Sequence, residues 1–203
     1  MKSGKQITQY LGEVAHVLLD LGVTTQFHML VAGGAYMLLL NERKFTRDID
    51  FALVELASPK IALHTILRVR IQRAEISGKG SSVPYSAEFK QAVEIVAQRH
   101  RGLTADWLND EAAVYYYDDA PVAEATFWRS FVDVLFIYLP TMEYMLATKL
   151  AAYRPKDLND IRVLLRALNV HTREQAKTIV DTFLLPDAQE FWEVEKKLRR
   201  LFP

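Results

Sequence analysis

An acidic strand that follows a glycine pair constrains the fold more than any other feature of the sequence. Gly33 and Gly34 end one apolar run and open a second one, which reads as a short helix. After a polar turn, Asp48 and Asp50 alternate with apolar residues, a pattern typical of a strand. Residues i and i+2 of a strand point to one face, so both carboxylates lie side by side while their neighbours enter the core. The chain is therefore expected to form a strand, a tight turn, a helix and an acidic strand, in that order.

The same residues predict a chemistry. Two carboxylates on one face, here Asp48 and Asp50, offer oxygen ligands to a hard cation such as Mg²⁺ or Mn²⁺. Paired glycines let a backbone turn come close to a ligand, and the N–H groups that open the following helix suit a phosphate. A phosphate site beside a divalent-metal site is suited to moving a nucleotidyl or phosphoryl group. We therefore expect Gly33 and Gly34 to hold the phosphates of a nucleotide.

The stretch from Val31 to Phe51 resembles the signature of the nucleotidyltransferase superfamily, a Gly-Gly or Gly-Ser turn, a short helix and Asp-x-Asp on a strand. Its extended form, Gly-Gly-Ala…Arg-x-x-Thr-x-Asp-Ile-Asp, is similar to the AbiEii/MenT-like branch, which includes toxins of bacterial toxin–antitoxin pairs and many uncharacterised proteins. The resemblance implies a metal-dependent enzyme that moves a nucleoside monophosphate from an NTP to an acceptor hydroxyl. It also implies that Arg43 and Thr46 hold the loop or touch a phosphate. From the residues alone, Arg43 equally well balances the charge of the nearby aspartates.

A second motif, in the last third of the chain, extends the resemblance. The run from Lys149 to Asp160 carries Lys…Arg-x-Lys-Asp-x-x-Asp, which resembles an element of the same branch. The resemblance implies that Lys149 reaches the triphosphate as a catalytic cation and that Asp160 belongs to the nucleotide site. Asp157 lies one helical turn before Asp160 and shares its face, although the helix dipole alone explains a carboxylate in a first turn.

A lone carboxylate inside an apolar run predicts a third catalytic and metal-binding residue. Asp133 stands among valines and phenylalanines, and an unpaired charge buried there would be costly. Members of the superfamily carry a third carboxylate on a strand adjacent to the Asp-x-Asp strand. We therefore expect Asp133 to bind a second metal ion or to accept the proton of the attacking hydroxyl. The alternative is an edge-strand residue that faces water.

Composition limits the partners. Lysine plus arginine equals aspartate plus glutamate, at 25 each, so an RNA acceptor has to be bound by local basic patches. The absence of cysteine excludes disulfides and thiolate metal sites and fits a reducing cytoplasm. No apolar run reaches the roughly 20 residues that a membrane span needs. The candidate patches are Lys60, Arg68, Arg70 and Arg73; Arg154, Lys156, Arg162 and Arg166; and Lys196, Lys197, Arg199 and Arg200.

The chain as a whole predicts an α+β (α/β) fold, with a small mixed sheet, flanking helices and a helical C-terminal region. We expect a nucleotidyltransferase core over residues 1–139 and a helical region over 140–203 that completes the nucleotide cleft. The segment 103–110 has no chemistry that we can assign, and Trp107 reads as a packing anchor. By periodicity, helices are expected over 5–21, 35–40, 58–73, 86–101, 141–153, 155–168, 172–183 and 186–201, and strands over 27–32, 48–54, 114–117 and 123–138, the last interrupted near Arg129 and Ser130.

Three functions stay open on the sequence. The first is a toxin-like enzyme that modifies RNA, with tRNA ends as the first candidate acceptor and a cognate antitoxin as partner. The second is transfer to a small molecule such as an antibiotic, or to a protein side chain. The third is a nucleotide-binding module without catalysis, against which the intact Asp48 and Asp50 argue.

Overall fold

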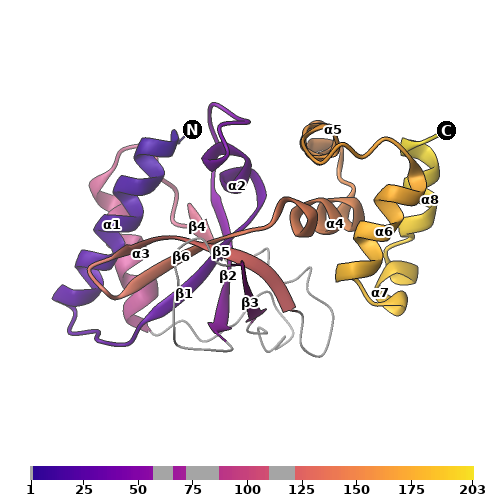
Figure 1. Cartoon of the computed structure of the whole chain (residues 1–203). Helices are drawn as coiled ribbons and strands as arrows, with labels where there is room; N and C mark the ends of the chain where they lie inside the picture. The colour runs from indigo at the N-terminus through magenta and orange to yellow at the C-terminus, as the bar shows by residue number, and fades with distance from the viewer. Residues whose placement is uncertain (1, 57–65, 72–86, 110–121) are drawn as a thin grey trace.

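A computed structural model of the chain describes residues 2–56, 66–71, 87–109 and 122–203 (Figure 1). Helices and strands are mixed along the first part of the chain, and helices alone fill the last part. This is the mixed α/β architecture that the sequence predicts. None of the helices in these ranges has both the length and the apolar character of a membrane span. The elements are α1 (Gly4–Asp20), β1 (Phe27–Val31), α2 (Gly33–Leu39), β2 (Ile49–Leu56), β3 (Ile66–Ile71), α3 (Ala87–Arg99), β4 (Leu108–Asn109), β5 (Val122–Phe131), β6 (Leu135–Pro140), α4 (Met142–Ala152), η2 (Pro155–Asp157), α5 (Leu158–Ala167), α6 (Arg173–Phe183), α7 (Pro186–Phe191) and α8 (Val194–Leu201).

The sheet is mixed, and β2 pairs with both of its outermost strands, β4 and β1. The strand order is β1-β6-β5-β3-β2-β4, and β1 also pairs with β2. The β1–β6 and β2–β4 pairs are parallel, and the others are antiparallel. Residues 51–53 of β2 pair with β1, whereas residues 54–56 pair with β3. Because β1 and β2 are antiparallel, the end of β1 meets the start of β2, which brings the glycine pair to the acidic strand.

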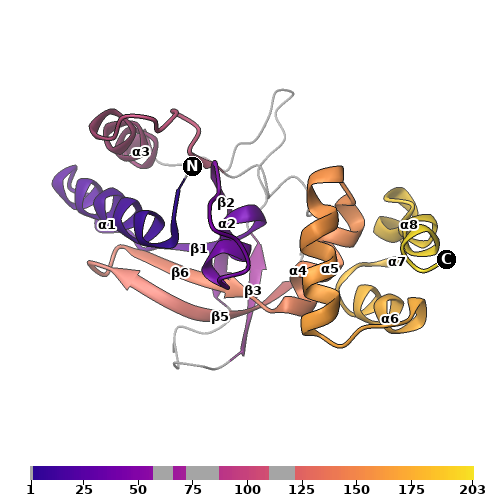
Figure 2. The same ribbon diagram turned by 90° about the horizontal axis from the view of Figure 1, so that it is seen from above.

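One face of the sheet is covered by α1 and α3 (Figures 1 and 2). Ser3 begins α1 with a capping box that includes Gln6, and Ile7, Leu11 and Leu18 along its apolar stripe are fully buried. Burying a side chain of this size contributes about 1.5–3 kcal/mol. The expected helices over 5–21 and 86–101 are thus confirmed as α1 and α3, within a few residues at each end.

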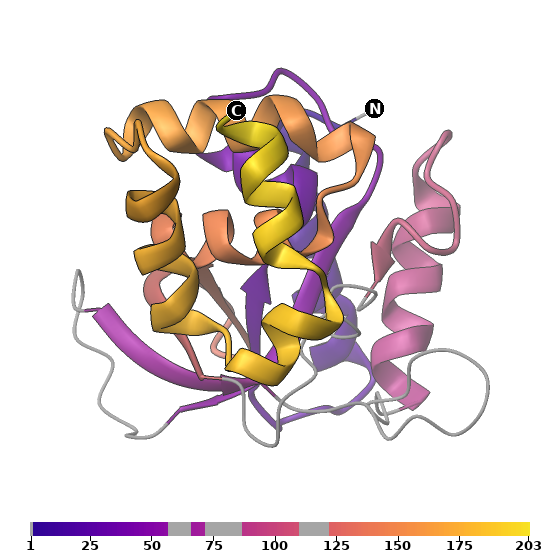
Figure 3. The same cartoon turned by 90° about the vertical axis from the view of Figure 1, so that its right-hand side faces the viewer.

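The C-terminal helices form a group beside the sheet (Figure 3). The chain passes from β6 almost directly into α4. Leu146 and Leu150 of α4 belong to the same hydrophobic cluster as Met29 of β1. Tyr144 of α4 joins a second cluster with Leu30 of β1. The hydrophobic core therefore continues across residue 140, and a division into two domains at that point stays a prediction.

Three expected elements are wrong. Residues 66–71 of the expected helix over 58–73 form β3 between β2 and β5, since arginines alternate there with apolar residues at the period of a strand. The expected strand over 123–138 breaks at residues 132–134, not near Arg129, where the pairing only shifts its register. The last helix is divided into α7 and α8 at Glu193, which has a φ of 47°. The expected strand over 114–117 and the remainder of 58–73 lie outside the described residues.

Candidate functional site

The glycine pair packs directly against the acidic strand and the loop before it. Gly33 has a φ of +60°, and a Cβ on it would lie 1.9 Å from Oδ2 of Asp50. A Cβ on Gly34 would lie 2.8 Å from Oγ1 of Thr46 and 3.0 Å from Nη1 of Arg43. The backbone N–H of Ala32 donates to the Asp50 carbonyl at 2.8 Å. The glycine turn therefore packs against Asp50, Thr46 and Arg43, and these five positions of the first motif meet at one edge of the sheet.

The two aspartates occupy the start of β2. Ile49 and Phe51 are fully buried in the core under α1 and α3. Strand alternation directs Asp50 to the opposite face, where Ala52 packs in the second cluster with Tyr144 of α4. Asp48 directly precedes the strand, and both acidic residues are half-buried. The predicted pairing of carboxylates outside the core is consistent with this arrangement.

The loop before β2 is held by Lys2, a residue that sequence reasoning missed. Thr46 is buried, and its Oγ1 donates to the Asp48 carbonyl at 3.0 Å. Its backbone exchanges two hydrogen bonds with Lys2, of 2.6 and 3.0 Å. The Nζ of Lys2, which is also buried, donates to the Arg47 carbonyl. Burial lowers the pKa of Lys2, although the negative charge of Asp48 opposes the shift. A lysine near the first residue of a chain carries no motif, so only the folded structure reveals it.

A buried ion cluster connects this loop to the C-terminal helices. Arg43 donates to Asp160 through Nε at 2.9 Å and Nη2 at 2.8 Å. The Nζ of Lys149 lies 2.8 Å from Asp160 and 3.1 Å from Asp157. Arg154 donates to Asp157 at 2.6 Å. Lys149 and Asp160 are 4% and 1% exposed, so this cluster belongs to the interior. The second motif is thereby brought to the first, as a set of ion pairs between elements far apart in the sequence.

The structure shows what the charged residues of the second motif contact. The ammonium of Lys149 faces two carboxylates rather than open space, and Asp160 is an acceptor for two cations. Arg43 is the cation whose Nη1 lies against the glycine turn, and its side chain keeps 31% of its surface exposed. Burial alone would raise the pKa of Asp157, but hydrogen bonds and charges from Arg154 and Lys149 outweigh it, so this pKa is lowered. Asp157 is therefore an ion-pair partner and not only a helix-dipole residue.

Asp133 lies away from the other site residues, which corrects the expected third carboxylate. It is exposed in the turn between β5 and β6, with a φ of 55°. This turn precedes Leu135, which pairs with Phe27 at the start of β1. Gly33 follows the other end of β1, so the length of this strand separates Asp133 from Gly33 and from Asp50, which Gly33 contacts. The charge stands in an apolar run because the chain reverses there, and water rather than a buried partner solvates it.

The segment for which the sequence offered no chemistry lies directly beside the acidic strand. β4 is parallel to β2, with Asn109 as the Cα partner of Asp50. Trp107 is fully buried, which confirms it as a packing anchor, and its carbonyl accepts from the N–H of Ile49 at 2.8 Å. The signal that sequence reasoning missed is a short apolar pair followed by asparagine, too brief for any periodicity test.

The donor types at the start of β2 fit a magnesium or manganese ion. Mg²⁺ is usually bound by one or two carboxylates plus phosphate oxygens and water, and Asp48 and Asp50 supply the two carboxylates. Among the residues that the structure describes, no three or more histidine, cysteine and acidic side chains lie together as a group that could hold a metal ion.

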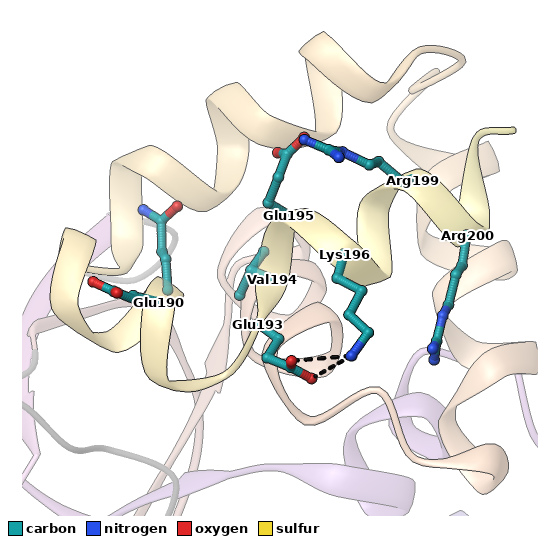
Figure 4. Close-up of a pocket in the computed structure, with 8 residues that line it drawn as sticks. Glu190, Glu193, Val194, Glu195, Lys196, Arg199 and Arg200 are labelled. Carbon is teal, nitrogen blue, oxygen red and sulfur yellow. Dashed lines mark hydrogen bonds and ion pairs between the residues drawn. The ribbon is translucent and has the colours of Figure 1, made fainter.

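A pocket of about 630 Å³ lies elsewhere, on α7 and α8, and its wall includes part of the C-terminal basic cluster (Figure 4). Lys196 pairs with Glu193 at 3.0 Å and Arg199 with Glu195 at 3.1 Å. Lys197 donates to the Ala151 carbonyl. Local carboxylates and carbonyls thus engage most of the cations expected to attract RNA at this end of the chain.

Gly33→Ala is expected to destabilise the fold and to move the Asp50 carboxylate. A left-handed backbone costs an L-residue about 1–2 kcal/mol, and the new Cβ would overlap Oδ2 of Asp50. Gly22→Ala is the matched control, because Gly22 has a φ of +80° and nothing within 4 Å of a Cβ. Urea unfolding should show a larger loss for Gly33→Ala, and Mn²⁺ titration should show weaker binding for that variant alone. Equal stability losses and equal Mn²⁺ affinities in the two variants would contradict the contact.

Comparisons with known proteins identify no relative. No family model matches the chain, and neither the curated proteins nor the solved structures give a match. What the chain does is therefore inferred from the geometry at the glycine turn and the start of β2.

Proposed function

We propose that the chain is a metal-dependent nucleotidyltransferase that moves a nucleoside monophosphate from an NTP to an acceptor hydroxyl. The observation that carries the proposal is the contact of the glycine pair with Asp50, Thr46 and Arg43. A turn without side chains, a guanidinium and the Asp50 carboxylate meet there within a few ångströms, and Asp48 lies two positions before Asp50. Phosphates need N–H donors and cations, whereas a metal ion needs carboxylates, and this edge of the sheet offers both kinds of group.

Each side chain has a task in this proposal. Asp48 and Asp50 hold the Mg²⁺ or Mn²⁺ ion, which, when bound, neutralises the triphosphate and lowers the pKa of the attacking hydroxyl. The first N–H groups of a helix have no acceptor within that helix. In this proposal, the backbone N–H groups of Gly33 and Gly34 bind phosphate oxygens. Arg43 adds a planar cation with further N–H groups beyond the two that Asp160 accepts. Thr46 fixes the loop that carries Asp48.

Lys149 and Asp160 act in this proposal mainly by holding Arg43. Asp160 accepts from Arg43 and from Lys149, and both contacts are buried or half-buried. For Lys149 itself to reach the leaving pyrophosphate, its ammonium would have to leave Asp157 and Asp160.

The transfer forms a bond from the acceptor oxygen to the α-phosphorus and breaks the bond from that phosphorus to the pyrophosphate oxygen. The hydroxyl proton passes to water.

The loop before β2 favours a nucleic-acid acceptor. Phe45 is 50% exposed, and its neighbours Lys44 and Arg47 are exposed as well. Exposed aromatic rings among cations are the usual means of binding single-stranded nucleic acid, because bases stack on the ring while cations meet the phosphates. We propose RNA as the acceptor, with tRNA ends as the first candidate. The resemblance to toxins of toxin–antitoxin pairs adds a cognate antitoxin as the proposed partner.

The test is transfer of label from each of the four α-labelled NTPs, in Mg²⁺, with total RNA present and Asp50→Asn as the inactive control. Label in RNA that depends on Asp50 supports the proposal, and so does inhibition of that labelling by salt. Label in a small molecule or in protein would keep the transferase and replace the acceptor. Binding of an NTP without transfer to any acceptor would indicate a nucleotide-binding module and overturn the proposed catalysis.

A further inference from the structure

The strand partner of Asp50 is an asparagine. β4 and β2 run parallel, and their Cα partners are Ile49 with Leu108 and Asp50 with Asn109. Neighbouring strands lie about 4.8 Å apart, and paired residues direct their side chains to the same face. Leu108 and Ile49 are both buried, as this alternation requires. The Asn109 side chain therefore emerges on the face that carries the Asp50 carboxylate.

The core fixes the position of β4. The Trp107 side chain is fully buried, and its Nε1 donates to the Val93 carbonyl of α3 at 3.2 Å. The Trp107 carbonyl accepts from Ile49 at 2.8 Å, directly before the Asp50 pairing. An anchor of this size beside a two-residue strand holds Asn109 in register with Asp50, so their proximity does not depend on a surface loop.

The orientation of the Asn109 amide is set by a second contact. Its Nδ2 donates to the Asp106 carbonyl at 3.2 Å, and a carbonyl accepts only from the nitrogen end of the amide. Oδ1 is therefore not the atom that meets the Asp106 carbonyl. A carboxamide oxygen and a carboxylate on the same face are both acceptors, and a cation is attracted to both. Asparagine oxygens are common ligands of hard divalent cations.

We infer that Asn109 is a further ligand of the divalent cation that Asp48 and Asp50 hold, and that its Oδ1 binds the ion beside Asp50. The inference rests on the proposed metal-dependent transferase. It supplies the third protein oxygen of the site from β4, in place of Asp133. It also assigns a task to the segment around Trp107, which brings this oxygen to the acidic strand.

The experiment is titration of the full chain with Mn²⁺, read by the electron paramagnetic resonance signal of free Mn²⁺, with a non-hydrolysable NTP analogue present. Asn109→Ala should weaken Mn²⁺ binding about tenfold, the effect of about 1.4 kcal/mol. Asn109→Asp should bind Mn²⁺ at least as tightly as the wild type, because a carboxylate is the stronger ligand. Asn159→Ala, an exposed asparagine on α5, is the matched control and should bind like the wild type.

The aspartate variant separates a ligand from a structural residue. Neither alanine nor aspartate can donate to the Asp106 carbonyl, so equal losses in both variants would make Asn109 a loop-holding residue and overturn the inference. Unchanged affinity in both variants, with binding lost in Asp50→Asn, would also overturn it and leave the proposed transferase intact. A wild-type chain that binds no Mn²⁺ in the presence of the NTP analogue would overturn the inference together with the metal-dependent function.

Discussion

Asp50→Asn is expected to abolish nucleotidyl transfer while the fold remains intact. The change removes a charge and keeps the shape of a side chain that packs against Gly33. Loss of a metal ligand removes several kcal/mol of transition-state stabilisation, which corresponds to about a thousandfold or more in rate. Without metal, the melting temperature should stay level or rise, since the repulsion between Asp48 and Asp50 is relieved. The measurement is single-turnover transfer from α-labelled NTP, together with thermal unfolding in a chelator.

Asp133→Asn is the matched control for this prediction. It makes the same chemical change in an exposed turn at the other end of β1, and asparagine tolerates a positive φ well. Its transfer rate should equal that of the wild type. Asp50 is a cleaner choice than Asp48, whose charge also acts on the buried ammonium of Lys2. Wild-type transfer by Asp50→Asn would end the nucleotidyltransferase proposal, and loss of transfer in Asp133→Asn would show that a carboxylate outside the start of β2 is needed.

The sequence predicted the first motif well because every signal in it is local. Alternation of Asp48 and Asp50 with Ile49 and Phe51 indicates which side chains enter the core, and the structure confirms the burial of the two apolar residues. The glycine pair likewise indicates a turn with close backbone approach. The sequence predicts only one of the two reasons for a glycine at position 33. Gly33 is needed for contact with Asp50 as well as for its backbone angle, and that contact depends on the pairing of β1 with β2.

Asp133 and β3 were mispredicted because period alone does not show where a chain reverses. The run around Asp133 has the composition of one continuous strand, yet Val132 and Asp133 both have positive φ and form a turn. Arg68 and Arg70 lie in the range 58–73, over which the sequence predicts a helix. In β3 they alternate with apolar residues and pair with β5. The pairing of β3 with β2 on one side and with β5 on the other decides between the two periods, and no window of the sequence contains these pairings.

The partners of the second motif were beyond sequence reasoning for a different reason. Arg43 and Asp160 are separated by 117 positions, and nothing near Lys149 in the sequence indicates that its ammonium is buried. A motif of lysine and aspartates is compatible with a phosphate site and with an internal ion cluster. The structure describes the cluster, which joins the loop before β2 to α4 and α5. Its stability is therefore open to direct measurement.

Lys149→Ala is expected to destabilise the fold strongly, in contrast to the modest effect that a phosphate-contacting surface lysine would have. Removing this ammonium leaves Asp157 and Asp160, both nearly fully buried, with one cation fewer. Breaking a buried ion pair by removing one partner costs about 3–5 kcal/mol. Lys156→Ala, two positions from Arg154 and exposed, should change the unfolding free energy by less than about 0.5 kcal/mol. Urea denaturation of the two variants beside the wild type measures the difference.

The paired outcome also distinguishes the two tasks of Lys149. A fold weakened by several kcal/mol, together with NTP affinity that falls only as far as in Arg43→Ala, would mean that Lys149 acts through Asp160 and Arg43. A wild-type unfolding midpoint for Lys149→Ala would contradict the buried cluster, because two interior carboxylates would have lost a cation at no cost. If that stable variant also lost its NTP affinity, the ammonium would have to face the triphosphate, and Asp157 would depend on Arg154 alone.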